Sequence, residues 1–175
     1  MYLTKSKIQK YKQCKKQLWL SENKPTLDET NDISKIIMNQ GSEFGSIIKE
    51  NFSNVFDIKE INTKRAIIET NLLIKQIVDD DKDAIIFEPA FSYADVIVRV
   101  DILEYVSKIK KWNITEVKSG NIFKKSDVKD HLLFDASIQY FVVKNNNIQI
   151  NNVYLGYPNR DFTLKEEFNY RGLLS

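Results

Sequence analysis

Residues 85–118 read IIFEPAFSYADVIVRVDILEYVSKIKKWNITEVK, and here the sequence changes to an alternation of period two with many β-branched residues. That pattern is typical of strands that bury one face in a core. We expect three strands, at Ile85–Phe91, Ala94–Leu103 and Trp112–Lys118. The lysine-rich segment Tyr105–Lys111 holds a turn, so the last two strands are predicted to form an antiparallel hairpin.

Other elements precede and follow these strands. Apolar spacing, capping residues and turn-forming clusters predict a helix over Thr4–Leu20, a helix over Ile33–Phe52, a short strand over Val55–Ile58, a strand or helix over Arg65–Val78, a helix from an N-cap at Ser126 to Lys144, and a strand over Val153–Tyr157. A strand pair, a crossing helix and a further strand must share one sheet to bury their faces. The sequence therefore predicts an α/β fold with a central mixed β-sheet.

Length and charge limit the class of protein. The 175 residues fit a single domain. With 26 Lys and Arg against 24 Asp and Glu, the formal net charge is +2, so any basic surface that attracts nucleic acid must be local. The sequence has no signal-peptide pattern and no run of about 18 apolar residues, so we expect a cytoplasmic protein that makes no membrane contact.

Two rare residue types exclude several kinds of site. Cys14 is the single cysteine, which excludes an internal disulfide, a cysteine-rich zinc site and a four-cysteine iron–sulfur cluster. We interpret Cys14 as a small buried apolar residue on the first helix. His131 is the single histidine, so a two-histidine metal motif is excluded. Carboxylates and lysines must therefore carry most of any chemistry.

Two acidic residues are predicted to meet in the hairpin. A turn centred between Lys108 and Ile109 places Asp101 opposite Glu116. Cross-strand partners lie roughly 4.5–5.5 Å apart at Cβ, and like charges at that distance repel. The pair therefore needs a cation or a raised pKa. Lys118 follows Glu116 by two residues and projects from the same face, whereas a slip of one residue would turn one carboxylate to the other face.

Two carboxylates with a lysine beside them suit phosphodiester hydrolysis. Carboxylate oxygens bind hard divalent cations such as Mg²⁺ or Mn²⁺, and the backbone carbonyl of Val117 is a further candidate ligand. A bound metal activates water and neutralises charge on the phosphate, and a nearby lysine stabilises the same charge. Asp101 and Glu116 are thus the predicted ligands, and Lys118 is the residue predicted to assist the water and the transition state.

The same residues carry a resemblance to a known family. Asp101 followed by Glu116-Val117-Lys118 resembles the signature of PD-(D/E)xK nucleases, in their RecB-like branch. The likeness covers about Thr4–Tyr157 and includes the segments 41–45, 87–91 and 135–140. It implies a metal-dependent deoxyribonuclease with an α/β/α sandwich around a restriction-endonuclease-like core. It also implies Asp101 and Glu116 as metal ligands and Lys118 as the catalytic lysine.

The resemblance also bears on how the protein is organised. Together, these matching segments look closest to those of bacterial proteins in which a RecB-like nuclease domain is followed by a longer conserved region. This implies that residues 1–175 form one nuclease domain and the N-terminal part of a longer protein, with a further domain or protein as a partner. DNA is the implied substrate, as single strands or duplex ends.

Three positions depart from the family pattern. Many RecB-like enzymes carry a metal-binding histidine on the helix before the sheet, where this sequence offers Glu43 as an oxygen ligand. Gln139 matches the glutamine that follows the lysine in the family, but Val143 stands where the family often has a tyrosine. Some relatives hold an iron–sulfur cluster with four cysteines, and the single Cys14 excludes one.

Several further residues have both a structural and a functional interpretation. Glu88, before Pro89 at the end of a strand, is either a solvated edge residue or a metal ligand. His131, Asp135 and Gln139 recur every four residues and form a polar line on the last predicted helix. We expect a solvated position for His131 and a position in the cleft for Gln139.

Lysines crowd the first predicted helix and the start of the last one, at Lys5, Lys7, Lys10, Lys12, Lys15, Lys16, Lys124, Lys125 and Lys129. Such runs are usually solvated faces, but beside a phosphate-cleaving site they also suit a nucleic-acid backbone. Tyr11 and Trp19 lie at helical spacing, which favours core packing over stacking on bases.

The leading hypothesis is a divalent-metal-dependent DNA nuclease. The alternative from another class is a catalytically silent nucleic-acid-binding or interaction module on a nuclease scaffold. The missing histidine and the altered glutamine motif favour that alternative. A nuclease that acts on RNA is a third hypothesis.

Overall fold

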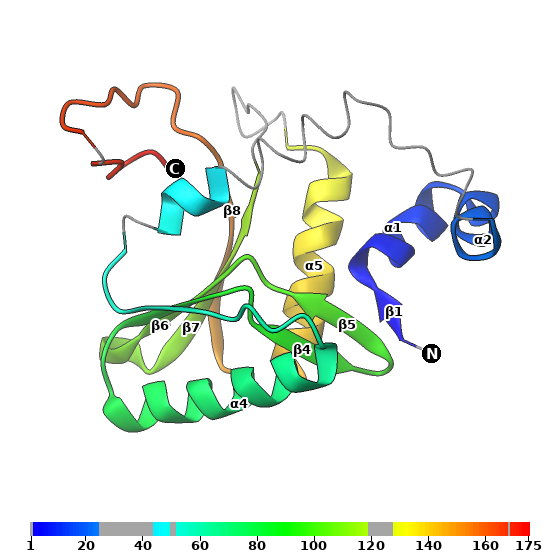
Figure 1. Cartoon of the computed structure of the whole chain (residues 1–175), viewed down its shortest axis with the longest axis horizontal. Coiled ribbons are helices and arrows are strands. Elements are labelled where there is room, and N and C mark those ends of the chain that lie inside the picture. Colours follow the sequence, from blue (N-terminus) through cyan, green and yellow to red (C-terminus); the bar gives the residue numbers. More distant parts are fainter. Residues whose placement is uncertain (1, 25–43, 50–51, 119–127, 168) are drawn as a thin grey trace.

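The computed structural model describes residues 2–24, 44–49, 52–118, 128–167 and 169–175 (Figure 1). In chain order its elements are β1 (Leu3–Thr4), α1 (Lys5–Gln13), α2 (Lys15–Asn23), β2 (Val55–Asp57), α4 (Thr63–Asp80), β3 (Ala84–Phe87), β4 (Ala90–Tyr93), β5 (Val96–Arg99), β6 (Ile102–Val106), the 3₁₀ turn η2 (Ser107–Ile109), β7 (Lys111–Val117), α5 (Asp130–Lys144) and β8 (Ile150–Gly156). Residues 44–49 are helical as well. None of the helices in these ranges is long and apolar enough to cross a membrane.

The described strands form two mixed sheets. One has the strand order β1-β5-β4, and the other has the order β2-β3-β6-β7-β8. Parallel and antiparallel pairs occur in both. The expectation of an α/β fold is therefore confirmed, and the larger mixed sheet holds the predicted hairpin strands β6 and β7 together with β8, while a second, smaller sheet was not expected.

A bend in one long hairpin separates the two sheets. Phe87 pairs with Ile102 and Ala90 with Arg99, so the pairing keeps the same register on both sides of the bend. The predicted strands Ile85–Phe91 and Ala94–Leu103 are thus each broken in two. Proline is the physical reason, since Pro89 has no amide hydrogen to donate to the ladder.

The residue before that proline completes the bend. Glu88 has a φ of 55°, in the left-handed region that few non-glycine residues adopt. Two backbone hydrogen bonds still cross the bend, from the Glu88 amide to the Asp101 carbonyl (3.3 Å) and from the Val100 amide to the Pro89 carbonyl (3.0 Å). The chain therefore changes direction here while its partners stay in register.

The second hairpin has the expected register. Ile102 pairs with Thr115 and Tyr105 with Trp112, which is the pairing that a turn centred between Lys108 and Ile109 produces. Asp101 lies directly before β6 and Glu116 lies near the end of β7. The next pair along this ladder is therefore Asp101 and Glu116.

Apolar residues cover both faces of the larger sheet around β3 and β6. On one face, Ile86, Leu103 and Ile114 belong to a cluster completed by α4 and α5. On the other face, Ile85, Phe87 and Ile102 pack with Ile48 of the helical residues 44–49 and with Phe52. Because successive side chains of a strand point to opposite faces of the sheet, the strands contribute to two separate apolar layers.

Helices α4 and α5 lie against the strands. Residues Arg65–Val78, predicted as a strand or a helix, belong to the amphipathic helix α4. Its buried side chains are Ala66, Thr70, Ile74 and Ile77. Helix α5 packs against β4, β5, β7 and β8. It begins at Asp130, and the predicted N-cap Ser126 lies outside the described residues.

The N-terminal helix is the main error in the expected elements. The predicted helix Thr4–Leu20 is two helices, separated by an extended residue at Cys14 (φ −164°, ψ 118°). Cys14 is exposed, and Tyr11 and Trp19 are 51% and 55% exposed, so the expected core positions are wrong. Neither helix has a fully buried residue, because its apolar stripe is narrow between many lysines.

Candidate active site

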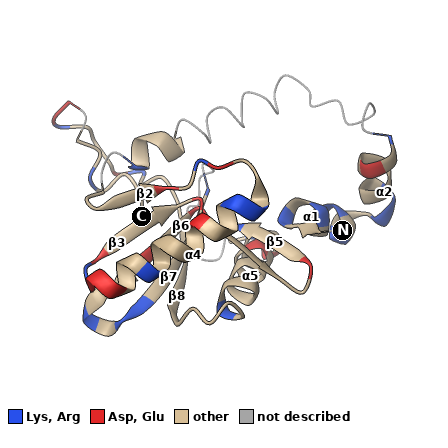
Figure 2. Ribbon diagram, turned by 60° about the horizontal axis from the view of Figure 1, so that its bottom comes forward, with Lys and Arg blue, Asp and Glu red and all other residues tan. Residues whose placement is uncertain are grey.

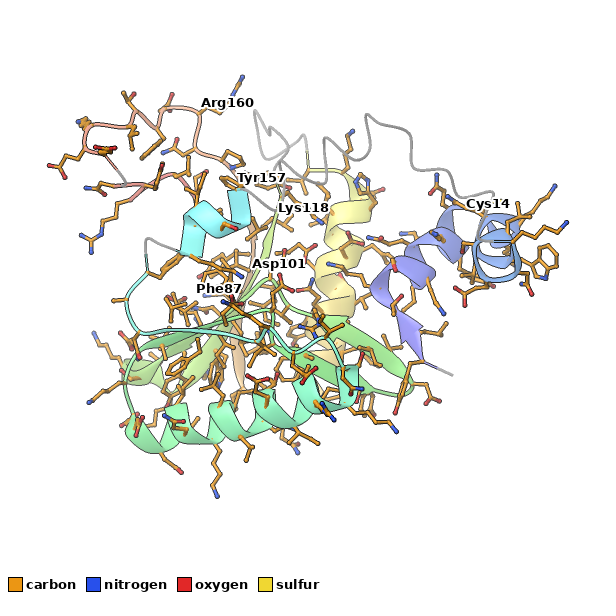
Figure 3. All side chains as sticks on the ribbon, in the orientation of Figure 1. Cys14, Phe87, Asp101, Lys118, Tyr157 and Arg160 are labelled. Carbon is orange, nitrogen blue, oxygen red and sulfur yellow. The ribbon has the colours of Figure 1, made fainter. Side chains whose placement is uncertain are left out.

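The bend and the second hairpin bring three carboxylates to one region. Glu88 stands opposite Asp101 in the first register, and Asp101 stands opposite Glu116 in the second. Asp101 continues the strand face of Leu103, and Glu116 continues that of Ile114. Both acids therefore leave the apolar core on the side that α5 covers, and Figure 3 shows Asp101 and Lys118 there, next to α5.

Glu116 is the most completely bound of these acids. Its side chain is 1% exposed. Lys118 Nζ lies 2.6 Å from its Oε1, Lys5 Nζ lies 2.8 Å and 3.0 Å from its two oxygens, and Gln139 Nε2 donates to Oε2. Burial opposes ionisation of Glu116, but the charge of Lys5 and the bonds from both lysines outweigh burial and lower its pKa. Glu116 is therefore a buried carboxylate held in its charged form.

Asp101 has fewer donors. Its Oδ2 accepts a hydrogen bond of 2.6 Å from the Val117 amide. Burial raises the pKa of Asp101 to about 7, the carboxylate of Glu116 adds to the rise, and Lys5 acts against it. The repulsion expected from the hairpin register is therefore present, and it adds to burial in raising the pKa of Asp101.

Glu88 lies close enough for its charge to act on Asp101. Burial raises the pKa of Glu88, while the charges of Lys49 and Arg99 act against that rise. Its side chain is half-buried, so the structure places it beside the site and not on a solvated edge. The other proposed ligand, Glu43, lies outside the described residues.

Arg99 fixes the backbone that presents Glu88. Its Nη1 donates to the carbonyls of Ile58 (3.2 Å) and Glu88 (3.3 Å), and its Nη2 donates to the carbonyl of Glu60. One guanidinium thus ties the bend to the chain segment that follows β2. The arrangement explains how a left-handed residue persists at position 88.

Lys118 bridges two buried acids. Besides Glu116, it lies 3.5 Å from Oδ2 of Asp135, which is 2% exposed. Burial alone would lower the pKa of Lys118, but its hydrogen bond to Glu116 and the nearby negative charges raise it. The lysine is therefore a fixed positive charge and does not act as a base near neutral pH.

Helix α5 supplies two residues of the polar line. Asp135 and Gln139 are buried and face β7, whereas His131 is exposed, as expected for a solvated position. The Oε1 atom of Gln139 is buried without a hydrogen-bond partner among the described residues. The hydroxyl of Tyr157 is also buried without a hydrogen-bond partner among the described residues. Burial raises the pKa of this hydroxyl. The site therefore holds two polar atoms that a ligand or water can satisfy.

Two site residues come from the N-terminal helix α1. Lys5 binds Glu116, and Gln9, one turn later, donates to Oδ1 of Asp135. Neither was among the predicted site residues, and Lys5 was assigned only to a basic run. Their spacing of four residues is the one signal in the sequence that groups them. Tyr157 had no such signal, because it follows a strand at the far end of the chain.

The donor set fits a divalent cation in part. Among the described residues, no group of three or more His, Cys, Asp or Glu side chains is close enough together to hold a metal. Asp101 and Glu116 nevertheless form an acidic pair, and the ammonium of Lys5 stands between the oxygens of Glu116 as a cation would. The free Oε1 of Gln139 is a further oxygen beside Glu116. The residues thus fit an ion held by two carboxylates, with other oxygens completing its shell.

A separate cavity does not belong to this site. It lies against the C-terminal residues and is lined by Ile48, Ile85, Glu104, Tyr170 and Leu174 among others. None of the carboxylates or lysines of the acidic pair line it. The chemistry of Asp101, Glu116 and Lys118 is therefore in a buried network and not in this hollow.

Comparison of the chain with models of protein families, with curated proteins and with solved structures found no match. No relative's activity can therefore be transferred to these residues.

Proposed function

We propose that this protein is a divalent-metal-dependent nuclease that hydrolyses phosphodiester bonds in DNA. One observation carries the proposal: the half-buried Asp101, directly before β6, lies close to the buried Glu116 of the neighbouring strand β7, with the ammonium of Lys118 2.6 Å from Glu116. Asp101 and Glu116 would hold Mg²⁺ or Mn²⁺, with Glu88 and the backbone of Val117 as further candidates. When bound, such an ion lowers the pKa of water and neutralises phosphate charge.

The roles of the chain's own residues follow from their charges. Lys118 keeps its proton, so it stabilises negative charge that develops on a phosphate and does not remove a proton from water. Gln139 orients Glu116 by donating to Oε2, while Lys118 binds Oε1 and Lys5 binds both oxygens. Asp135 in turn holds Lys118 from the side of α5. Glu116 and Lys118 are thus each positioned by a second side chain.

The fold supports the same assignment. The larger sheet carries one apolar layer with α4 and α5 and another with residues 44–49, which is compatible with an α/β/α sandwich. We propose that this arrangement is a restriction-endonuclease-like core of the RecB-like kind. We further propose that residues 1–175 are one nuclease domain of a longer cytoplasmic protein, which acts with a further domain or partner.

The N-terminal helices support DNA as the substrate. Residues 2–24 hold seven lysines and a single acid, Glu22. Figure 2 shows basic segments on α1 and on part of α2, where one acidic segment is also visible. Tyr11 and Trp19 are exposed on them, and Lys15 lies over the Tyr11 ring at 5.5 Å. Lysines that follow phosphates beside rings that stack on bases suit single strands or the ends of duplexes.

Cleavage assays test the proposal. Labelled single-stranded and duplex DNA are incubated with the protein and Mg²⁺, Mn²⁺ or a chelator. We expect cleavage with either metal and none with the chelator. Glu116→Gln and Lys118→Met should each reduce the rate by about 100-fold or more. The matched controls are Glu104→Gln, on the neighbouring strand β6, and Lys111→Met, at the start of the strand β7 that Lys118 directly follows. Absence of cleavage with every metal, or equal rates for parent and Glu116→Gln, contradicts the proposal.

A second candidate is a catalytically silent nucleic-acid-binding module. It is favoured by the absence of a three-residue metal group among the described residues and by the neutralisation of Glu116 by Lys5. Calorimetry separates the two: DNA binding without Mn²⁺ or Mg²⁺ binding supports the silent module. Matched RNA and DNA strands of the same sequence test whether RNA is the substrate instead.

A further inference from the structure

Lys5 lies at the centre of the acidic site although it comes from the start of the chain. Its Nζ is 2.8 Å and 3.0 Å from the two oxygens of Glu116, so it binds that carboxylate with both. Its positive charge also favours ionisation of Asp101 and Glu88. The single ammonium of Lys5 therefore stabilises the negative charge of three carboxylates. A metal ion bound among these carboxylates would stabilise the same charges.

The position of Lys5 is determined by the fold. Strand β1 pairs in parallel with β5, with Leu3 opposite Val96 and Thr4 opposite Ile97. The Thr4 side chain then caps α1 by accepting a hydrogen bond from the Lys7 amide (3.3 Å). Lys5 is the first residue of that helix, and Gln9 on the next turn binds Asp135. Two side chains on one helix face thus attach α1 to the site.

This attachment is shallow. Strand β1 has two residues, and α1 and α2 have no fully buried side chain. Lys5 itself is 23% exposed, whereas Glu116 is 1% exposed. The two lysines of the site therefore differ: Lys118 directly follows β7, the strand of Glu116, and its amide bonds the Gly156 carbonyl (2.9 Å), whereas Lys5 comes from the peripheral helix α1. Of the two, Lys5 is the one that can withdraw while the sheet stays intact.

Any divalent cation that enters the site meets Lys5. The ion needs oxygens of Glu116, and both oxygens are engaged by the Lys5 ammonium. Glu116 already holds the ammonium groups of Lys5 and Lys118, so a divalent ion that binds the same carboxylate is repelled by both, and repulsion is relieved when one of them leaves. The same carboxylate also accepts a hydrogen bond from Nε2 of buried Gln139, whose Oε1 has no hydrogen-bond partner among the described residues.

We propose that Lys5 is a positioning residue of the site, which holds the acidic cluster together in the metal-free protein and is displaced from Glu116 by the divalent ion. This inference rests on the proposed function only for the identity of the ion. It makes the metal affinity of the protein depend on a residue outside the sheet. It also couples metal binding to release of the lysine-rich helix α1.

Calorimetric titration with MnCl₂ tests the competition on the full chain. We compare the parent with Lys5→Gln, Lys5→Arg and the control Lys7→Gln, whose lysine pairs with Glu22 on α2 and not with the site. Lys5→Gln should bind Mn²⁺ at least about tenfold more tightly, the ratio expected for removal of one charge-assisted hydrogen bond. Lys5→Arg should stay close to the parent, since it keeps the competing charge, and Lys7→Gln should equal the parent.

A second measurement uses the parent alone and does not depend on a variant that folds. Amine-reactive labelling followed by mass spectrometry reports the accessibility of Lys5, with Lys7 as an internal reference. Lys5 should be labelled slowly without metal and faster with saturating Mn²⁺, while the labelling of Lys7 stays unchanged. The metal-free and metal-loaded proteins are the same chain, so a difference reports displacement directly.

The outcomes separate this inference from the nuclease proposal. Equal Mn²⁺ affinities for the parent and Lys5→Gln overturn the inference, whether or not DNA is cleaved. Labelling of Lys5 that does not respond to Mn²⁺ overturns it too, as does failure of both proteins to bind the ion. A tenfold affinity difference without DNA cleavage supports the inference and refutes the nuclease.

Discussion

Asp101 and Glu116 lie one position beyond the Ile102–Thr115 pair that ends the β6–β7 ladder, but they do not have equal hydrogen-bond donors. Glu116 binds two ammonium groups and one amide, whereas Asp101 receives the Val117 amide. The pKa of Glu116 is lowered and that of Asp101 is raised to about 7. Unequal environments thus divide two like acids into a charged one and one that titrates near neutral pH.

The first prediction concerns pH and Asp101 in the absence of metal. Its pKa rises from 3.8 in the unfolded chain to about 7 in the folded protein, so the folded state binds the proton more tightly between these values. The stability contributed by this proton is present in full below pH 4 and is lost as the pH rises through 7. Each pKa unit corresponds to about 1.4 kcal/mol.

Asp101→Asn isolates this effect from that of the surrounding Glu88, Glu116, Lys5 and Lys118. The amide cannot ionise and still accepts the bond from Val117, so the variant should gain stability relative to the parent as the pH increases from 5 to 8. Urea unfolding in the presence of a chelator measures the difference. A difference that stays constant with pH contradicts the assignment.

The second prediction concerns Gln139. Replacing it with leucine removes one of the donors of a buried carboxylate, so Gln139→Leu should lower the free energy of unfolding by about 1–3 kcal/mol. Ser137→Ala, on the exposed side of α5, is the control and should change stability by less than about 0.5 kcal/mol. Urea denaturation of both variants provides the comparison. Equal stabilities would show that Glu116 does not need the amide.

The third prediction concerns Arg99. Arg99→Met leaves the carbonyls of Ile58, Glu60 and Glu88 without their donor and frees the bend from its anchor. We expect a loss of about 2 kcal/mol or more in the free energy of unfolding. Arg65→Met on the exposed side of α4 should have little effect. If the two variants unfold at the same denaturant concentration, the bend does not depend on the guanidinium.

The fourth prediction concerns the exposed aromatic residues of the N-terminal helices. Trp19→Ala should weaken binding of a single-stranded oligonucleotide by about 1–3 kcal/mol, because one base loses its stacking partner. The melting temperature should hardly change, since α2 has no fully buried residue. Tyr154→Ala, at a similarly exposed aromatic on β8, is the control. Fluorescence anisotropy measures both, and equal weakening by the two changes excludes a specific role for α2.

The pairing of Asp101 with Glu116 is predictable from the sequence because it is a local property. The two strands are joined by a short connection, and the turn between Lys108 and Ile109 sets which residues face one another. Alternation then assigns Lys118 to the same face as Glu116. The break at Glu88 and Pro89 is harder to predict, because proline in a strand is compatible with an edge, a bulge or a bend.

The positions of Tyr11, Cys14 and Trp19 were wrong for a different reason. Apolar spacing indicates that a helix has an apolar stripe, but it does not tell whether another element covers that stripe. Here the helix also breaks at Cys14, which turns the second half away from the first. Periodicity is a weak guide to burial at the periphery of a fold.

The order of residues within one hairpin was enough to place two acids and a lysine together, since neighbouring strands in a hairpin have little freedom of register. The environment of those residues depends on the whole chain. Lys5 reaches Glu116 across 111 positions of sequence, and it does so because β1 pairs with β5 and α5 returns over β7. Such distant contacts arise from closing long loops and packing several elements at once, which neither local propensity nor periodicity encodes.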